Sequence, residues 1–337
     1  MAWRLLWVLS CHQGMVRGAV FSAVGTRYGD LNQDRGFVFD EMVGSEPGAY
    51  LLAGVFDGHG LLGDHAAQLA VDTVVAWFQE DGIRRRVHET LCQRTDAALR
   101  EQQVQLILRE VIQQTHERIL ASYDTPPHSA FYGPSGHFHF DEARHQYVSA
   151  SEPDDKRPLE FGTTAILAFY DIANNTLYTA QLGDSLAALG GSAAETDPDG
   201  AKGTISARML SLPHAHSARN KTERERVMQE RNPVRLALHA IRVGPHVLRI
   251  TRALGHKHLS IEPEFLVVHP QKNEQVLVLG SDGVFDIIGV EDAVRFCVEF
   301  DDPAQAAEEL VIQATELARV EAEDSVDNTT AVVIFLD

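Results

Sequence analysis

The sequence is poor in cysteine, in positive charge and in long apolar runs. Three of its 337 residues are cysteines, Cys11, Cys92 and Cys297, which is too few for a disulfide framework and fits a reducing compartment. No apolar run approaches the roughly 18 residues that a membrane-spanning helix needs. Lys plus Arg number 29 against 48 Asp plus Glu, so the net charge is −19. Neither nucleic acid nor an anionic membrane is therefore an expected partner.

The first 17 residues are predicted to be an N-terminal extension or a weak targeting segment. Their apolar stretch, residues 5–9, is short for the core of a signal peptide, and no clear small-residue cleavage site follows it. We expect a cytoplasmic or nuclear protein, with an organelle reached through this N-terminus as the alternative. Hydrophobic residues make up 44% of the chain and charged residues 23%, as in globular proteins. Residues 18–337 are therefore predicted to form a single domain.

Short β-branched runs alternate with longer helical patterns along the chain. Strands are predicted over residues 18–24, 36–41, 50–56, 275–279 and 329–336, and a hairpin over residues 163–182 with its turn at Asn174-Asn175. Helices are predicted over residues 64–78, 91–120, 222–230, 290–300 and 303–321. Residues 124–160 are rich in proline and are predicted to be an irregular connection, and residues 190–204 a mobile loop. Strands in hairpins rather than in strict βαβ order favour a mixed fold of helices and sheets.

Aspartates recur where the predicted strands begin or end, namely Asp34, Asp57, Asp184, Asp282 and Asp327. For each aspartate alone, a place in a turn is the ordinary explanation. Together they suggest another role, because carboxylates held at neighbouring strand ends can converge on one point. Mg²⁺ and Mn²⁺ prefer such oxygen ligands. Without cations the same carboxylates would repel one another and raise each other's pKa.

Seven short motifs occur along the chain in the same order as in a known protein family. They are Asn32-Gln33-Asp34, Val55-Phe56-Asp57-Gly58-His59-Gly60, Phe161-Gly162-Thr163-Thr164-Ala165, Leu182-Gly183-Asp184-Ser185, Thr251-Arg252-Ala253-Leu254-Gly255, Ser281-Asp282-Gly283-Val284-Phe285-Asp286 and Asp327-Asn328-Thr329-Thr330. This ordered set resembles the metal-dependent protein Ser/Thr phosphatases of type 2C, the PPM family, over about residues 20–337.

The resemblance implies an α+β fold, a four-layer α-β-β-α sandwich with two central antiparallel sheets flanked by helices. It implies two Mg²⁺ or Mn²⁺ ions at one end of the sandwich, both bridged by Asp57. The Gly58 carbonyl and the carboxylates of Asp34, Asp282 and Asp327 would complete the protein ligands. Asp184, with Asp282, would lie near a looser third metal site.

The resemblance also implies the reaction and its substrates. A metal-bridging water would attack the phosphorus of phosphoserine or phosphothreonine in line, without a phosphoenzyme. His59 would be the general acid for the leaving alkoxide, since the pKa of histidine can lie near neutrality. Arg27 is the candidate phosphate-binding arginine. The implied partners are phosphorylated proteins, and the chain is expected to be a monomer.

Four positions depart from the family pattern. Gln33 stands where many members have Glu, Leu186 where Arg is usual, Ala215 where the family often has Asp, and His256 where Asp is usual. None of these changes removes a predicted metal ligand. They motivate a second hypothesis, a catalytically weak or inactive pseudophosphatase that acts as a binding module.

Two weaker patterns compete with this interpretation. Residues 11–17 fit CxxGxxR, the phosphate loop of the cysteine-dependent tyrosine phosphatases, although a predicted strand begins where that loop requires a helix. Three closely spaced histidine pairs, at positions 137 and 139, 214 and 216, and 256 and 258, could bind zinc. They lack cysteine partners at a fixed distance, so loop histidines are the expected explanation.

The thiol hypothesis has a direct test. Cys11→Ser should leave phosphatase activity unchanged, because the metal-dependent reaction uses no thiol. The measurement is the rate of aryl-phosphate hydrolysis by the two purified proteins with Mn²⁺. Loss of activity in Cys11→Ser would restore the cysteine mechanism.

Overall fold

The fold is taken from a computed structural model, which describes residues 16–41, 49–92, 96–127, 138–149, 159–192, 205–211, 216–229, 234–237, 240–243, 246–322 and 325–336. Of the helices in these ranges, none combines the length and the apolar character that crossing a lipid bilayer requires.

Two antiparallel sheets form the centre of the molecule. The first has the strand order β1 (Val16–Ala23), β16 (Thr329–Leu336), β15 (Val276–Gly280), β9 (Leu186–Ser192) and β10 (Ile205–Met209). The second has the order β14 (Glu264–Val268), β8 (Thr176–Leu182), β7 (Ala165–Asp171), β3 (Tyr50–Gly60) and β2 (Asp34–Glu41), and the short β6 (Phe161–Thr163) pairs with the end of β3. Two small sheets are formed by β4 (Phe138–Asp141) with β5 (Gln146–Ser149), and by β11 (Val234–Ala237), β12 (Ala240–Val243) and β13 (His246–Leu248).

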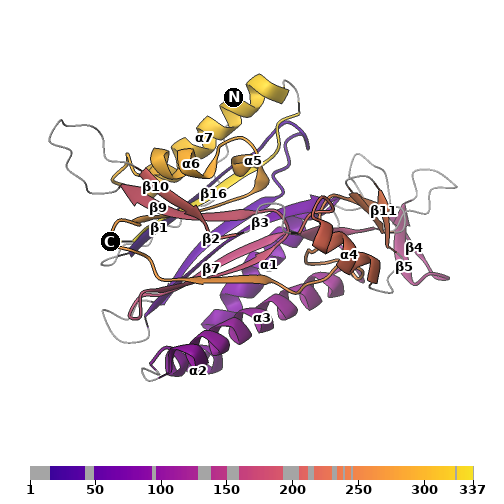
Figure 1. The fold of residues 1–337 in the computed structure, drawn as a ribbon. Helices are drawn as coiled ribbons and strands as arrows, with labels where there is room; N and C mark the ends of the chain where they lie inside the picture. The colour runs from indigo at the N-terminus through magenta and orange to yellow at the C-terminus, as the bar shows by residue number, and fades with distance from the viewer. Residues whose placement is uncertain are drawn as a thin grey trace.

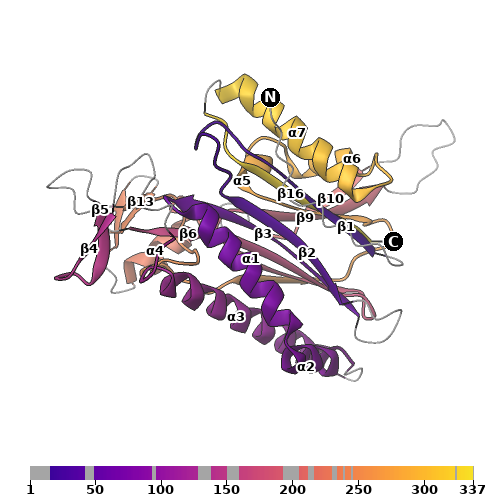
Figure 2. The ribbon, with the colours of Figure 1, turned by 180° about the vertical axis from the view of Figure 1, so that it is seen from behind.

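Helices cover the outer face of each central sheet (Figures 1 and 2). The first sheet is covered by α5 (Asp282–Phe285), α6 (Val290–Cys297) and α7 (Pro303–Ala322). The second is covered by α1 (Gly63–Gln79), with α2 (Asp81–Cys92) and α3 (Ala97–Ala121) packed beside it. The remaining helix, α4 (Lys221–Gln229), lies near the small strands at one end of the molecule (Figure 1). The predicted four-layer α-β-β-α sandwich is confirmed.

Three apolar cores separate the four layers. The middle core lies between the sheets and includes Val20, Val55, Ile166, Leu279 and Val332. The outer cores hold α1 and α3 against the second sheet and α5, α6 and α7 against the first. The inner strands are therefore covered on both faces, and β7, β8, β15 and β16 are buried at every position. This explains why β7, β15 and most of β16 are continuous apolar runs rather than alternating ones, while β8 also buries Thr179 and Gln181.

Several predicted elements agree closely with the structure. The hairpin is β7 and β8, α7 begins at the predicted Pro303, and β16 has the predicted bounds. The helix predicted over residues 91–120 is wrong at its start. The chain instead has two helices there, α2 and α3, and α3 begins after Asp96, whose side chain accepts a hydrogen bond from the Leu99 N–H. The predictions missed α2 because most of its residues are polar and it buries few side chains.

The irregular segments contain more structure than predicted. A small hairpin, β4 and β5, lies within residues 124–160, and residues 128–137 and 150–158 are outside the described part. The predicted mobile loop overlaps the end of β9, and its residues 193–204 are also outside the described part. Residues 1–15, with Cys11, are not described either, and Arg17 lies in β1. A strand therefore runs through the position where a cysteine-phosphatase loop would need its helix.

The middle core should carry much of the stability of the sandwich. Ile166, fully buried on β7, is predicted to lose about 2–5 kcal/mol of unfolding free energy on replacement by alanine. Chemical denaturation measures this change. Val320→Ala is the control, because Val320 is 81% exposed on α7 and should change stability by less than about 0.5 kcal/mol. Equal effects of the two substitutions would contradict the described layer order.

Candidate functional site

The predicted aspartates lie at one end of the sandwich. In the second sheet this end holds the start of β2 and the end of β3, where Asp34 and Asp57 are direct cross-strand partners. In the first sheet it holds the end of β15, which Asp282 follows, and the start of β16, which Asp327 precedes. Asp184 lies in the short connection from β8 to β9, which joins the two sheets at the same end.

The Asp34–Asp57 pairing places two carboxylates on one face of a buried ladder. Side chains of directly opposed residues in antiparallel strands are neighbours. Asp34 is 2% exposed. The Asp57 backbone is held on the opposite side by Thr164, whose Oγ1 accepts from the Asp57 N–H at 3.1 Å and whose N–H donates to the Asp57 carbonyl at 2.9 Å. Two carboxyl groups are thus fixed side by side.

Polar contacts join the two sheets around Asp34. Its side chain forms hydrogen bonds with Ser281 and Thr330 of the first sheet, and these bonds act to lower its pKa. The hydroxyl of Thr330 is also hydrogen-bonded to Ser22 on β1 at 2.5 Å, and Asn32 donates to the same Ser22 oxygen at 2.8 Å. Asp34 of the second sheet is therefore tied to the first sheet by a network of buried polar contacts.

Burial and mutual repulsion raise the pKa of three carboxyl groups. Desolvation is the largest cause in each case. It raises the pKa of Asp34 to about 6, and it raises the pKa values of Asp57 and Asp282 well above their usual range. The next causes for Asp57 are the charges of Asp34, Asp282, Asp184 and Asp327, in that order. Carboxylates from both sheets are thus close enough to disfavour one another's ionised form.

The site offers oxygen donors of the kind that metal ions bind, but its described residues do not hold them in the arrangement of a bound ion. No three His, Cys, Asp or Glu side chains in the described ranges are arranged so that they could hold a metal ion as they stand. The donors nevertheless fit a hard cation in kind. Asp34 Oδ2 and Gln33 Oε1 are buried acceptors without a hydrogen-bond partner, and a divalent cation would relieve the repulsion among the carboxylates. The predicted residues are thus suited to Mg²⁺ or Mn²⁺ by their chemistry, although their side chains are not arranged around a common ion position.

Gly58 is packed too tightly for any side chain. A Cβ atom there would lie 2.2 Å from the Gly63 carbonyl oxygen and 2.5 Å from that of Gln33. Its N–H donates to the Gln33 carbonyl at 3.1 Å, which ties the end of β3 to the start of β2. The predicted metal ligand at this position is the Gly58 carbonyl. The close packing fits this prediction, because it admits the backbone of Gly58 but no side chain.

The turn that carries Asp184 is fixed by its neighbours. Gly183 has φ +95°, a conformation that favours glycine. Its N–H donates to Nδ1 of the buried His216 at 3.0 Å, and burial lowers the pKa of His216 to about 3. His216 is therefore neutral at pH 7, and its Nδ1 accepts the hydrogen bond that fixes this turn.

Arg27 lies beside the cluster and is paired with Asp327, although it was predicted to bind phosphate. Its side chain is 41% exposed. Its guanidinium also lies 5.5 Å from the centre of the Tyr28 ring, and burial raises the pKa of Tyr28 to about 12. Tyr28 was not predicted as a site residue, and no motif in the sequence marked it.

His59 lies near the end of β3 and contacts a second histidine. Its Nε2 is 2.7 Å from Nε2 of His256, and the two rings lie edge to edge with nearly parallel planes and centroids 5.0 Å apart. Burial lowers the pKa of His59 to about 4, while a hydrogen bond with the Asp57 backbone acts in the opposite direction. The expectation of a pKa near neutrality therefore does not hold in this structure, because the ring is desolvated.

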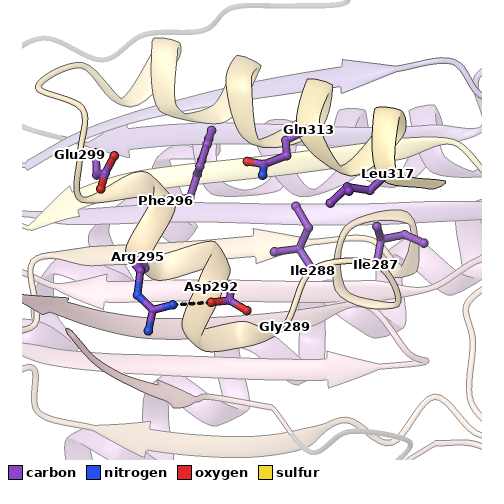
Figure 3. A pocket seen from close by; sticks show the side chains of 9 residues that line it. All are labelled: Ile287, Ile288, Gly289, Asp292, Arg295, Phe296, Glu299, Gln313 and Leu317. Carbon is purple, nitrogen blue, oxygen red and sulfur yellow. Dashed lines mark hydrogen bonds and ion pairs between the residues drawn. The ribbon is translucent and has the colours of Figure 1, made fainter. Parts of the chain in front are cut away.

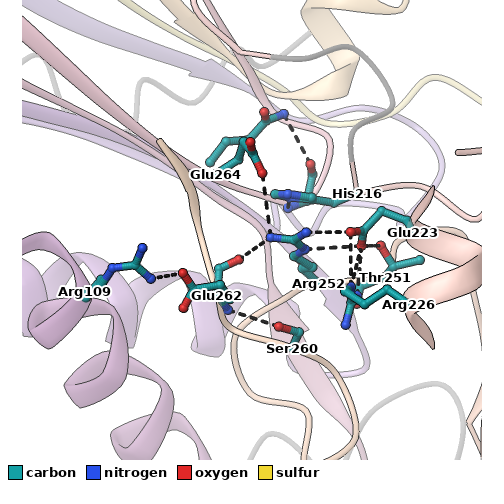
Figure 4. A network of polar contacts seen from close by, with 11 residues as sticks. Arg109, His216, Glu223, Arg226, Thr251, Arg252, Ser260, Glu262 and Glu264 are labelled. Carbon is teal, nitrogen blue, oxygen red and sulfur yellow. Dashed lines mark hydrogen bonds and ion pairs between the residues drawn. The ribbon is translucent and has the colours of Figure 1, made fainter. Parts of the chain in front are cut away.

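A buried ionic network supports the segment that carries His256 (Figure 4). Glu223 of α4 forms ion pairs with Arg252 at 2.5 Å and with Arg226 at 2.8 Å, and accepts from the Thr251 hydroxyl at 2.7 Å. The Thr251 N–H in turn donates to the His216 carbonyl at 2.8 Å. The Asp184 turn and the His256 segment are thus linked through one set of contacts.

A groove of about 330 Å³ lies elsewhere, between α6 and α7 and the turn before α6 (Figure 3). Apolar side chains such as Phe296 and Leu317 line it, and an Asp292–Arg295 ion pair of 2.5 Å lies at its edge. It contains none of the predicted site residues. The carboxylate cluster therefore remains the candidate site.

Comparison with known proteins identifies the fold and the family. The sequence model for "Protein phosphatase 2C" matches residues 136–322, which is more than half of the chain. The solved structure of the serine-threonine phosphatase 2C from Toxoplasma gondii superposes with a TM-score of 0.71 at 19% identity, over 100% of this chain and 99% of that one. A sex-determining protein from C. elegans gives a TM-score of 0.59 at 19% identity, over 98% of this chain and 67% of that one. At these identities the likeness concerns the fold alone.

Curated relatives extend the comparison to plants. A protein kinase and PP2C-like domain-containing protein of rice (Oryza sativa subsp. japonica) is 31% identical over 180 residues, which cover 52% of this chain and 24% of that protein. Probable protein phosphatase 2C 22 of Arabidopsis thaliana is 25% identical over 322 residues, which cover 88% of this chain and 61% of that protein. The chain thus spans about a quarter of the length of the rice relative.

The Glu223 network should stabilise the protein in a pH-dependent way. Burial raises the pKa of Glu223, but hydrogen bonds from Arg252, Arg226 and Thr251 outweigh it and lower the pKa from 4.5 to about 2. Glu223→Gln should therefore cost about 3 kcal/mol at pH 7. Because the folded pKa is the lower one, this contribution is present above about pH 4.5 and is lost as the pH falls toward 2.

Urea denaturation of the two proteins from pH 7 to pH 3 measures this difference. Glu308→Gln is the matched control, since Glu308 is exposed on α7. A difference that stays constant over the whole range would contradict the described ion pairs.

Proposed function

Because the chain belongs to the protein phosphatase 2C family, we propose that it is a Mg²⁺- or Mn²⁺-dependent protein serine/threonine phosphatase. The observation that carries the proposal is the group of aspartates from both sheets, in which Asp34 is buried, Asp57 and Asp282 are partly buried, and all three have raised pKa values. Such a group is costly without cations, because its members repel one another. The proposed substrates are phosphorylated proteins.

Each predicted ligand has a proposed place. Asp34, Asp57, Asp282 and Asp327, with the Gly58 carbonyl, would hold two cations, and Asp184 with Asp282 would bind a third more weakly. When bound, the cations would supply a water of lowered pKa and would neutralise charge on the phosphoryl group. Gln33, where many members have Glu, contributes an amide oxygen without a charge.

Two side chains are proposed to act on the substrate. Arg27, exposed at the edge of the cluster, would bind the phosphate oxygens and would exchange its partner Asp327 for them. His59 would give a proton to the serine or threonine oxygen as the P–O bond breaks. It is mostly neutral above about pH 4, so it must take up a proton first, and an adjacent phosphate dianion would favour that uptake.

The alternative is a pseudophosphatase that binds partners without turnover. Two contacts favour it, since the His59 ring is engaged with His256 and the Arg27 guanidinium with Asp327. The complete set of predicted ligands favours the enzyme. The two hypotheses differ in whether the metal-loaded protein hydrolyses a phosphoester.

Asp57→Asn tests the proposal. It should reduce metal-dependent hydrolysis of a phosphoserine peptide by about 100-fold or more, because it removes a charge next to both proposed cations. It should also reduce the rise in melting temperature that Mn²⁺ gives to the wild-type protein. Asp72→Asn, at an exposed position of α1, is the control for both measurements.

The outcomes separate the hypotheses. Activity that needs metal and is lost in Asp57→Asn supports the phosphatase. A wild-type protein that Mn²⁺ stabilises but that hydrolyses nothing supports the pseudophosphatase. Full activity in Asp57→Asn would overturn the proposed metal centre.

A further inference from the structure

We propose that His256 is a positioning residue for His59, and that it fixes the plane of the His59 ring and, before that ring takes up the proton that it donates, the tautomer of its neutral form. The inference rests on the proposed function, because His59 acts there as the general acid. Its basis is the contact between the two rings. Their Nε2 atoms are 2.7 Å apart, and the ring planes are within 2° of parallel. His256 is 4% exposed, so its ring is held by its surroundings.

The backbone brings the two histidines together from both sides of β6. On one side, His59 of β3 is the cross-strand partner of Gly162 on β6. On the other side, Leu254 exchanges two backbone hydrogen bonds with Thr163, of 3.2 and 2.9 Å. The next residue, Gly255, donates its N–H to Nδ1 of His116 on α3 at 3.2 Å. The segment before His256 is thus fixed to the same short strand as His59.

The absence of a side chain at Gly162 gives the His256 ring its space. A Cβ atom at this position would lie 2.6 Å from His256 Nε2 and 2.4 Å from the Leu254 carbonyl oxygen. Both distances are far shorter than any real contact of a Cβ atom. The ring of His256 therefore passes over a glycine to reach His59, and any larger residue there would block the contact.

The Nε2–Nε2 contact couples the tautomers of the two rings. A neutral imidazole has one donor and one acceptor nitrogen. A hydrogen bond between two Nε2 atoms requires a proton on one of them and a lone pair on the other, so the state of His256 selects the state of His59. The second nitrogen of His256, Nδ1, faces Glu160 with its Oε2 at 3.9 Å.

Two substitutions separate the hydrogen bond from the packing. His256→Phe keeps an aromatic ring and removes the hydrogen bond. His256→Gln keeps an amide that can reach the position of Nε2 and removes the ring. We expect His256→Phe to slow hydrolysis of a phosphoserine peptide by about 10-fold or more, and to slow an activated aryl phosphate much less, because only the alkoxide needs the acid. His256→Gln should recover most of the peptide activity.

The second measurement is independent of turnover. The ¹⁵N chemical shifts of the His59 ring, recorded on the metal-free protein, report its tautomer. They should change in His256→Phe and stay close to wild type in His256→Gln. His139→Phe, at an exposed position of β4, is the control for both measurements. Should His256→Phe fail to fold, His256→Asn replaces it, since its amide is one methylene too short to reach His59.

The outcomes distinguish this inference from the proposed function. An active wild type in which His256→Phe slows both substrates equally, or neither, would overturn the positioning role and leave the phosphatase intact. Unchanged His59 shifts in His256→Phe would do the same. An inactive wild type would defeat the proposed function, and the ring shifts would still decide whether His256 sets the tautomer of His59.

Discussion

The repulsion among buried carboxylates is the constraint on which the rest of this structure depends. Asp57 lies on the second sheet and Asp282 directly after β15 of the first, yet the charge of Asp282 is among the causes that raise the pKa of Asp57, and the charge of Asp34 among those that raise the pKa of Asp282. A protein keeps such groups close only if other contacts fix them. The apolar core between the sheets and the Ser22–Thr330 contact supply that rigidity at this end of the sandwich. A cation bound there would add to the stability of the docked sheets.

Backbone geometry sets the site as much as side-chain chemistry does. Gly58 and Gly162 lie on neighbouring strands, and at each of them an added Cβ would collide with backbone atoms. Thr164, the residue directly before β7, forms hydrogen bonds with the Asp57 backbone, and His216 accepts a hydrogen bond from the Asp184 turn. The glycines and hydrogen-bonding side chains near the predicted ligands thus determine where the carboxylates lie.

Much of this arrangement could be predicted from the sequence. Apolar runs, interrupted by polar residues in β8, indicated β7, β8, β15 and β16, since these strands are covered on both faces. The aspartates near their ends marked the site. The order of the motifs supplied the four layers. What could not be predicted depends on contacts between distant residues. The polar helix α2 buries too few side chains to show a period, and β9 is rich in alanine and glycine. The desolvation that lowers the pKa of His59, and its contact with His256, require the packed structure.

The place of β16 in the first sheet has a consequence for synthesis on the ribosome. β16 follows every other described element along the chain, yet it lies between β1 and β15 and pairs with both. Until it emerges from the exit tunnel, β1 has no neighbour within its sheet, and Asp327 has not joined the other carboxylates. The edge of β1 therefore stays unpaired while most of the described residues are made, and that of β15 for the shorter time between its own synthesis and that of β16. The site is completed only when β16 inserts between β1 and β15.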